Sequence, residues 1–173
     1  MSKMIFVLGG ARSGKSRYAA QIAKKIDKKT VFIATATALD GEMKERIRLH
    51  KISRPKNWGL IEEPLSLSKV LLKSKPAYDT VLIDCVGLWV SNLLMANMKD
   101  GEIEKKIKEL TDSILKAKFS LVIIVSNEVG TGLVPADPVS RRFRDLVGLA
   151  NQAMAAGANE VIMMQAGIPV RIK

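Results

Sequence analysis

The stretch that decides the fold is Phe6-Val7-Leu8-Gly9-Gly10-Ala11-Arg12-Ser13-Gly14-Lys15-Ser16. It runs an apolar strand directly into the pattern G-x-x-x-x-G-K-S, which is typical of a P-loop. In such a loop the glycines let backbone N–H groups surround phosphate oxygens, and the lysine supplies a cation to the terminal phosphates. The serine, at the N-terminus of the next helix, can hold Mg²⁺. The stretch therefore predicts a nucleoside triphosphate site.

The segments on both sides of this loop have the pattern that a P-loop requires. Residues 4–8 are continuously apolar, as in a buried strand. On the other side, apolar residues recur at helical spacing at Tyr18, Ala19, Ile22, Ala23 and Ile26. This strand–loop–helix context favours a P-loop over a chance glycine turn.

The bulk composition indicates one globular domain over residues 1–173. The chain is 47% hydrophobic and 26% charged, which is ordinary for a folded domain of this length. Its apolar runs are too short to span a bilayer, and the N-terminal one leads into the P-loop rather than to a cleavage site. The single cysteine, Cys85, cannot form an internal disulfide. These features predict a cytoplasmic protein without membrane insertion.

The net charge of +11 lies entirely in the first part of the chain. Residues 1–75 hold 17 basic and 6 acidic side chains, whereas residues 76–173 hold 11 of each. A triphosphate-binding site accounts for part of this excess, and the lysines near the end of the first helix complement its dipole. Because aromatic residues make up only 5% of the chain, no nucleic-acid platform is predicted.

The rest of the chain alternates apolar strands with helices. Strands are expected at 31–35, 59–62, 81–84, 119–126, 161–165 and 168–172, and helices at 41–53, 65–72, 88–98, 102–118 and from Pro138 onward. This alternation predicts a mostly parallel α/β sheet of the P-loop NTPase type, with helices on both faces. The last two strands flank Ala166-Gly167 and predict an antiparallel edge hairpin.

Asp84 ends the apolar strand Val81-Leu82-Ile83-Asp84. At the carboxyl end of a parallel strand beside a P-loop, this carboxylate is suited to share Mg²⁺ with Ser16. Apolar strands that end in aspartate are common, however, so a simple strand-end carboxylate is the alternative.

The only histidine of the chain, His50, lies in a basic segment. If residues 46–54 were one helix, Arg46, His50 and Arg54 would share a face because they recur every four residues. Positive neighbours disfavour the imidazolium, so a neutral His50 would be able to attack phosphorus. The alternative is a surface histidine on a solvated basic helix.

Further motifs match one known family in order and spacing. They are Ile33-Ala34-Thr35-Ala36, Asp40-x-Glu42-Met43, Arg46-Ile47, His50-x-x-x-Arg54-Pro55-x-x-Trp58, Asp84-Cys85, Ser91-Asn92-Leu93-Leu94, Ser126-Asn127-Glu128-Val129-Gly130-x-Gly132-x-Val134-Pro135 and Phe143-Arg144-Asp145-x-x-Gly148-x-x-Asn151-Gln152. With the P-loop, they make nearly the whole chain resemble the bifunctional adenosylcobinamide kinase / adenosylcobinamide-phosphate guanylyltransferase.

The resemblance implies two reactions: phosphorylation of adenosylcobinamide, and transfer of GMP from GTP to adenosylcobinamide phosphate. It implies that His50 carries the GMP, that Lys15 acts on the phosphates, and that Ser16 and Asp84 hold Mg²⁺. GTP and ATP would be the substrates, and the protein would be a homo-oligomer, possibly a trimer. The nucleotide contacts that it implies are Gly9, Gly10, Ala11, Arg12, Ser13, Gly14, Lys15, Ser16, Thr35, Ala36, Thr37, Ile52, Ser53, Arg54, Pro55, Glu62 and Asp84.

Alternatives stay open for single residues and for the function. Thr35 and Thr37 could equally be ordinary hydroxyls at the end of a strand, and Glu62 a surface carboxylate. Arg12 could point into solvent instead of toward a phosphate. Trp58 could be a core residue instead of a stacking partner for a base. Another small P-loop kinase, limited to γ-phosphoryl transfer, is the second functional hypothesis. A nucleotide-dependent switch is the third, although Asn127-Glu128 stands where a guanine-reading N-K-x-D motif would be expected.

Overall fold

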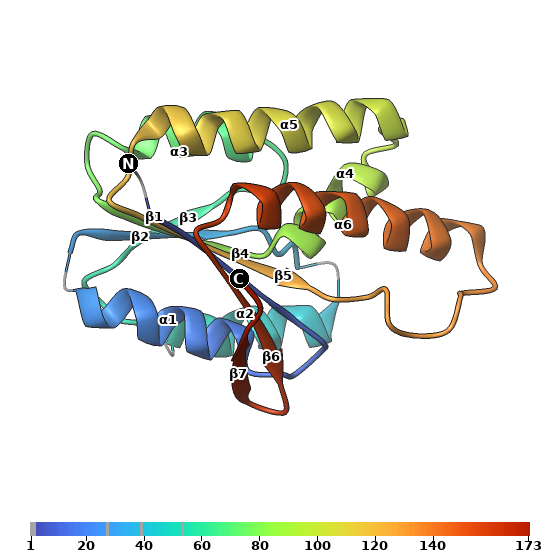
Figure 1. Cartoon of the computed structure of the whole chain (residues 1–173), viewed down its shortest axis with the longest axis horizontal. Helices are drawn as coiled ribbons and strands as arrows, with labels where there is room; N and C mark the ends of the chain where they lie inside the picture. The colour runs from blue at the N-terminus through green and yellow to red at the C-terminus, as the bar shows by residue number, and fades with distance from the viewer. Residues whose placement is uncertain (1–2, 27, 39, 53) are drawn as a thin grey trace.

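The computed structural model describes residues 3–26, 28–38, 40–52 and 54–173. Strands and helices alternate along this part of the chain, and Figure 1 shows them by label. The elements are β1 (Lys3–Gly9), α1 (Lys15–Ile26), β2 (Thr30–Ala34), α2 (Gly41–Ile52), β3 (Gly59–Glu62), α3 (Leu67–Ser74), β4 (Thr80–Asp84), α4 (Val86–Met95), α5 (Asp100–Ala117), β5 (Leu121–Asn127), α6 (Pro138–Gly157), β6 (Glu160–Gln165) and β7 (Ile168–Arg171).

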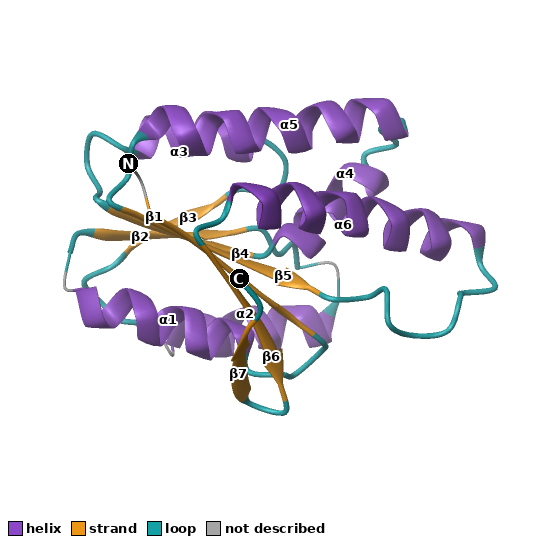
Figure 2. Ribbon diagram, in the orientation of Figure 1, coloured by secondary structure: helices purple, strands orange, loops and turns teal. Residues whose placement is uncertain are grey.

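The strands form one seven-stranded sheet in the order β3-β2-β4-β5-β1-β6-β7. Every neighbouring pair is parallel except β6 and β7, which form an antiparallel hairpin at the edge. The central strands are buried along nearly their whole length, because helices cover both faces of the sheet (Figure 2). The predicted α/β fold with its C-terminal hairpin is confirmed.

Each face of the sheet has its own hydrophobic core. One core lies under α3, α4, α5 and α6, and includes Phe6, Trp89 and Leu110. The other lies on the side of α1 and α2, where Phe32 and Leu82 pack with residues of α1. Trp58 packs against this second core and is half-buried, so its reading as a core residue is favoured.

Several element boundaries differ from the sequence expectations. The helix expected at 65–72 is Leu67–Ser74, and the one expected at 88–98 is Val86–Met95. More consequentially, α2 ends at Ile52, and Ser53 lies outside the described residues. Arg54 is therefore not on the helix of His50, and the prediction that they share a helical face is wrong. The physical reason is Pro55, because the residue before a proline is disfavoured in helical conformation.

Among the described residues, no helix combines the length and apolar character needed to cross a membrane.

Candidate functional site

The candidate site lies along the edge of the sheet where the parallel strands end. The P-loop follows β1, Thr35 follows β2, Glu62 ends β3, and Asp84 ends β4. Because β3, β2, β4, β5 and β1 are consecutive neighbours in the sheet, their carboxyl ends meet along this one edge. In open parallel sheets this edge is where ligands bind.

The P-loop requires glycine at its first position. Gly9 has a φ of +154°, and a Cβ there would lie 2.5 Å from the carbonyl oxygen of Met164 and 2.8 Å from Oγ of Ser13. The loop is fixed from two sides: Glu128 N donates to Gly9 O at 2.9 Å, and Gly167 N donates to Ser13 O at 3.1 Å. The carboxyl end of β5 and the turn of the C-terminal hairpin therefore hold the loop in place.

Lys15 is held inside this loop. Its side chain is only 7% exposed, and Nζ donates to the carbonyl oxygen of Gly10 at 2.6 Å. Burial lowers the pKa of Lys15, and the nearby charge of Asp84 opposes that shift. Asp84 and Lys15 are thus close enough to interact, as the P-loop interpretation requires.

Ser16 and Asp84 have the donor chemistry that suits Mg²⁺. Both are half-buried oxygen donors, Ser16 in the first turn of α1 and Asp84 at the end of β4. The described residues contain no group of three His, Cys, Asp or Glu able to hold a metal by themselves. Mg²⁺ takes one or two protein oxygens and completes its shell with water and substrate phosphates, so its binding by Ser16 and Asp84 stays a prediction.

The segment after β2 is tied to the neighbouring strands. Thr35 is fully buried; its hydroxyl donates to the carbonyl oxygen of Cys85 and accepts from the N–H of Cys85, each at 2.8 Å. The hydroxyl of Thr37 donates to Oδ1 of Asn92 at 3.1 Å. Ala36 lies half-buried between them. These hydroxyls have structural partners, and their contact with a nucleotide stays a prediction.

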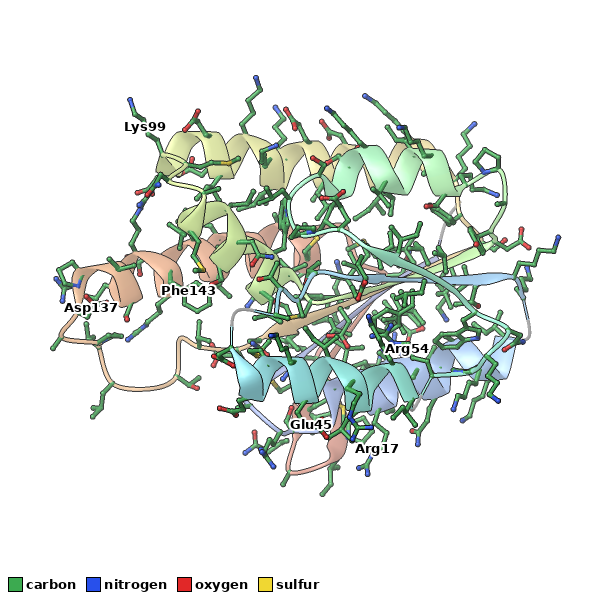
Figure 3. All side chains as sticks on the ribbon, turned by 180° about the vertical axis from the view of Figure 1, so that it is seen from behind. Arg17, Glu45, Arg54, Lys99, Asp137 and Phe143 are labelled. Atoms are coloured by element: carbon green, nitrogen blue, oxygen red, sulfur yellow. The ribbon has the colours of Figure 1, made fainter. Side chains whose placement is uncertain are left out.

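Arg54 reaches the same edge from beyond the end of α2. Its guanidinium carbon lies 3.8 Å from the centroid of the Phe32 ring, and Figure 3 shows Arg54 between the sheet and the helices on that face. Nε and Nη1 are buried and have no hydrogen-bond partner among the described residues. Burial lowers the pKa of Arg54, and the charges of Asp84 and Glu62 oppose the shift. A desolvated cation with unused N–H groups is a ready partner for an anion.

The remaining predicted residues are more exposed. Arg12 is exposed and has a φ of +55°, and Glu62 is exposed and forms an ion pair with Lys51 of α2 at 2.8 Å. Ile52, which ends α2, is 67% exposed, and Pro55 is half-buried. His50 belongs to α2 by its backbone, and its side chain lies outside the described residues, as Ser53 does altogether.

Sequence reasoning gave no role to two residues that contact groups near this edge. Phe32, in the middle of β2, is the aromatic partner of Arg54, and Asn92 contacts the segments that follow β2 and β3. For Asn92 the signals were its place in the motif Ser91-Asn92-Leu93-Leu94 and an amide side chain in the mostly apolar helix α4. Phe32 gave no signal, because an aromatic residue in a buried strand is ordinary.

The fold and this edge define a P-loop nucleotide-binding protein of the α/β class. The family model described as cobinamide kinase / cobinamide phosphate guanyltransferase matches residues 5–172. The chain belongs to this family, which confirms the resemblance seen in its motifs.

Relatives match along nearly their whole length. The chain is 41% identical over 170 residues to the bifunctional adenosylcobalamin biosynthesis protein CobP of Pseudomonas aeruginosa, covering 96% of this chain and 95% of that one. It is 36% identical to the bifunctional adenosylcobalamin biosynthesis protein CobU of Escherichia coli and 38% identical to that of Salmonella typhimurium, covering 98% of this chain and 99% of each relative.

Solved structures with low sequence identity share the fold alone. The RadB recombinase superposes with a TM-score of 0.56 at 13% identity, covering 93% of this chain and 73% of that one. An ATP synthase subunit, NeqB from Nanoarcheaum equitans, superposes with a TM-score of 0.54 at 15% identity, covering 95% of this chain and 46% of that one.

Proposed function

We propose that this protein phosphorylates adenosylcobinamide and then transfers GMP from GTP to adenosylcobinamide phosphate, with His50 as the temporary GMP carrier. The observation that carries the proposal is the family match over residues 5–172. It is supported by the placement of Lys15 after the loop that follows β1, of Asp84 at the end of the nearby strand β4, and of Arg54 on the Phe32 ring of β2. His50 is the only histidine of the chain, so it is the only imidazole able to take this role.

In the kinase step, the P-loop holds the triphosphate and Lys15 acts on its terminal phosphates. The Nζ of Lys15, which now donates to Gly10 O, would exchange this carbonyl for phosphate oxygens. Ser16 and Asp84 would hold Mg²⁺, which supplies charge neutralisation at the phosphate oxygens when bound. The hydroxyl oxygen of the aminopropanol arm of adenosylcobinamide then bonds to the γ-phosphorus while the bond to the β-phosphate oxygen breaks. Nucleoside diphosphate leaves with that electron pair, and the hydroxyl proton passes to water.

In the guanylyl step, the neutral imidazole of His50 attacks the α-phosphorus of GTP. A P–N bond forms while the bond to the β-phosphate oxygen breaks, and pyrophosphate leaves with that electron pair. A phosphate oxygen of adenosylcobinamide phosphate next attacks the same phosphorus, the P–N bond breaks, and His50 returns to its free form. Arg54 is placed to bind an anionic group during this step, because its desolvated N–H groups lack partners among the described residues.

The setting of these reactions is also part of the proposal. We expect a cytoplasmic homo-oligomer that takes GTP and ATP as substrates, with no nucleic-acid partner. Cys85, the single cysteine of the chain, is a buried free thiol, which is compatible with a reducing compartment, and the P-loop supports nucleotide substrates.

The test is incubation with Mg²⁺ and GTP labelled at the α-phosphate. We expect an acid-labile, base-stable GMP adduct on the unaltered protein, no adduct on a His50→Ala variant, and retained kinase activity in that variant. Arg48→Ala is the matched control, because Arg48 is an exposed residue of the same helix paired only with Glu45 in the described contacts. Absence of the adduct from the unaltered protein, with phosphorylation of the substrate intact, would leave a kinase restricted to γ-phosphoryl transfer.

A further inference from the structure

The described side chains of α2 are packed less deeply than those of the other helices. The helices α1, α3, α4, α5 and α6 all contain buried residues. Every described side chain of α2 is instead half-buried or exposed, and its apolar residues Leu49 and Ile52 are 53% and 67% exposed. Because packing of a buried face normally supplies most of a helix's stability, contacts of the chain before and after α2 take a larger share in placing this helix. This is the helix that carries His50.

At the N-terminal end, Asn92 holds the chain that leads into α2. Its Nδ2 donates to the carbonyl oxygens of Thr35 at 2.7 Å and Pro64 at 3.2 Å. Its Oδ1 accepts from the hydroxyl of Thr37 at 3.1 Å. Both amide hydrogens and the amide oxygen are thus used, and one side chain joins the segments that follow β2 and β3. Asp40, three residues after Thr37, then caps α2 by accepting from Met43 N at 2.7 Å.

At the C-terminal end, Phe32 holds the chain that leaves α2. The guanidinium of Arg54, two residues beyond the end of the helix, stacks at 3.8 Å from the Phe32 ring centroid. Phe32 is 4% exposed and lies in β2 between Leu60 and Leu82 of the neighbouring strands, so its ring is a fixed surface. Such a stacked cation is attracted by the face of the ring.

We propose that Asn92 and Phe32 are positioning residues: they hold the chain before and after α2, and the guanylyl transfer assigned to the histidine of that helix depends on them. The inference rests on the proposed function, since it concerns the guanylyl step. The kinase step depends on Lys15, Ser16 and Asp84, none of which belongs to α2. The two holding points therefore control guanylyl transfer much more than phosphorylation.

The test compares two variants with two matched controls. Phe32→Leu removes the ring but keeps an apolar side chain, and Phe119→Leu makes the same change in a buried residue that lies just before the amino end of β5. Asn92→Asp replaces both amide donors with an oxygen that faces two carbonyl groups. Asn159→Asp is its control, because the amide oxygen of Asn159 accepts from Met4 N at the amino end of β1.

The measurement is the single-turnover rate of self-guanylylation at saturating GTP and Mg²⁺, beside the kinase rate at the same temperature. Because a displacement of about 1 Å at a reacting group costs on the order of 100-fold in rate, we expect guanylylation to fall roughly 10- to 100-fold in either variant. The kinase rate should stay within about threefold, and both controls should keep the ratio of the two rates. Phe32→Tyr, which restores an aromatic face, should recover guanylylation.

Three outcomes would overturn the inference. The first is an equal fall of both rates in the variants, which is what general destabilisation would produce. The second is a fall in the controls as large as in the variants, and the third is an unchanged guanylylation rate. Thermal melts identify a variant that does not fold, and the variant at the other end of α2 then decides the question. No adduct on the unaltered protein would overturn both this inference and the proposed function.

Discussion

The segment from β1 to α1 and the helix α2 represent two ways of building one site. The P-loop between β1 and α1 is held by backbone hydrogen bonds from Glu128 and Gly167, and its lysine is almost fully buried. Helix α2 buries no described side chain, and the chain before and after it is contacted by Asn92 and Phe32. The first region is rigid because its neighbours surround it, whereas the second depends on a few contacts.

This difference suits two reactions that share a triphosphate. Holding the phosphates needs fixed N–H groups and a fixed cation, because preorganised groups stabilise charge without rearranging. Guanylyl transfer needs an imidazole that reaches the α-phosphorus from outside the P-loop. The same imidazole must then leave room for the second substrate. A sparsely packed helix with defined ends meets that second need. The predictions below separate the two regions.

The largest effect should come from removing the cation of the rigid region. Lys15→Ala should lower both the kinase and the guanylyl transfer rates by about 10²- to 10³-fold, because one preorganised electrostatic contact to the reacting phosphates is lost. The measurement is kcat/KM for each reaction, with Lys24→Ala, at the exposed end of α1, as the control. Loss of guanylyl transfer alone would contradict the idea that one cradle serves both reactions.

The next effect compares the packing of the two regions directly. Leu82→Ala should lower the free energy of unfolding by about 2–5 kcal/mol, because Leu82 is fully buried and its truncation leaves a cavity. Leu49→Ala in α2 should change the free energy of unfolding by no more than about 0.5 kcal/mol, because Leu49 is 53% exposed. Urea unfolding measures both. A large effect at Leu49 would mean that α2 is packed as firmly as the core.

The sequence predicted the rigid region far better than α2. The signals for the rigid region are local: continuous apolar strands, the glycine spacing and Asp84 at the end of a strand. Each of them predicts the structure of the segment in which it lies. The arrangement around α2 depends on contacts between residues that are far apart in the sequence. Arg54 stacks on Phe32 of β2, and Asn92 donates to carbonyl groups of the segments that follow β2 and β3. The four-residue spacing of His50 and Arg54 was misleading because Pro55 limits the helix, a local rule that overrides periodicity.

A smaller effect tests the backbone of the P-loop. Gly9→Ala should destabilise the fold by about 1–3 kcal/mol, because its φ of +154° disfavours a side chain and a Cβ would meet Met164 O at 2.5 Å. Gly10→Ala is the matched change, since a Cβ there has no described atom within 4 Å. Thermal melts of the two variants should therefore differ. Equal stability would mean that the P-loop or the backbone at Met164 can shift at little cost in free energy. The P-loop region would then be less rigid than its hydrogen bonds indicate.

The smallest effect concerns the one ion pair described between α2 and β3. Lys51 and Glu62 meet at 2.8 Å, with side chains 43% and 51% exposed. Because water screens such pairs, Lys51→Met should change the free energy of unfolding by no more than about 1 kcal/mol. The difference should shrink at about 0.5–1 M salt, where dissolved ions screen charges beyond a few ångströms. Urea unfolding at low and high salt measures this. A larger, salt-independent loss would show that α2 is fixed along its length, and the contrast between a surrounded loop and an end-held helix would fail.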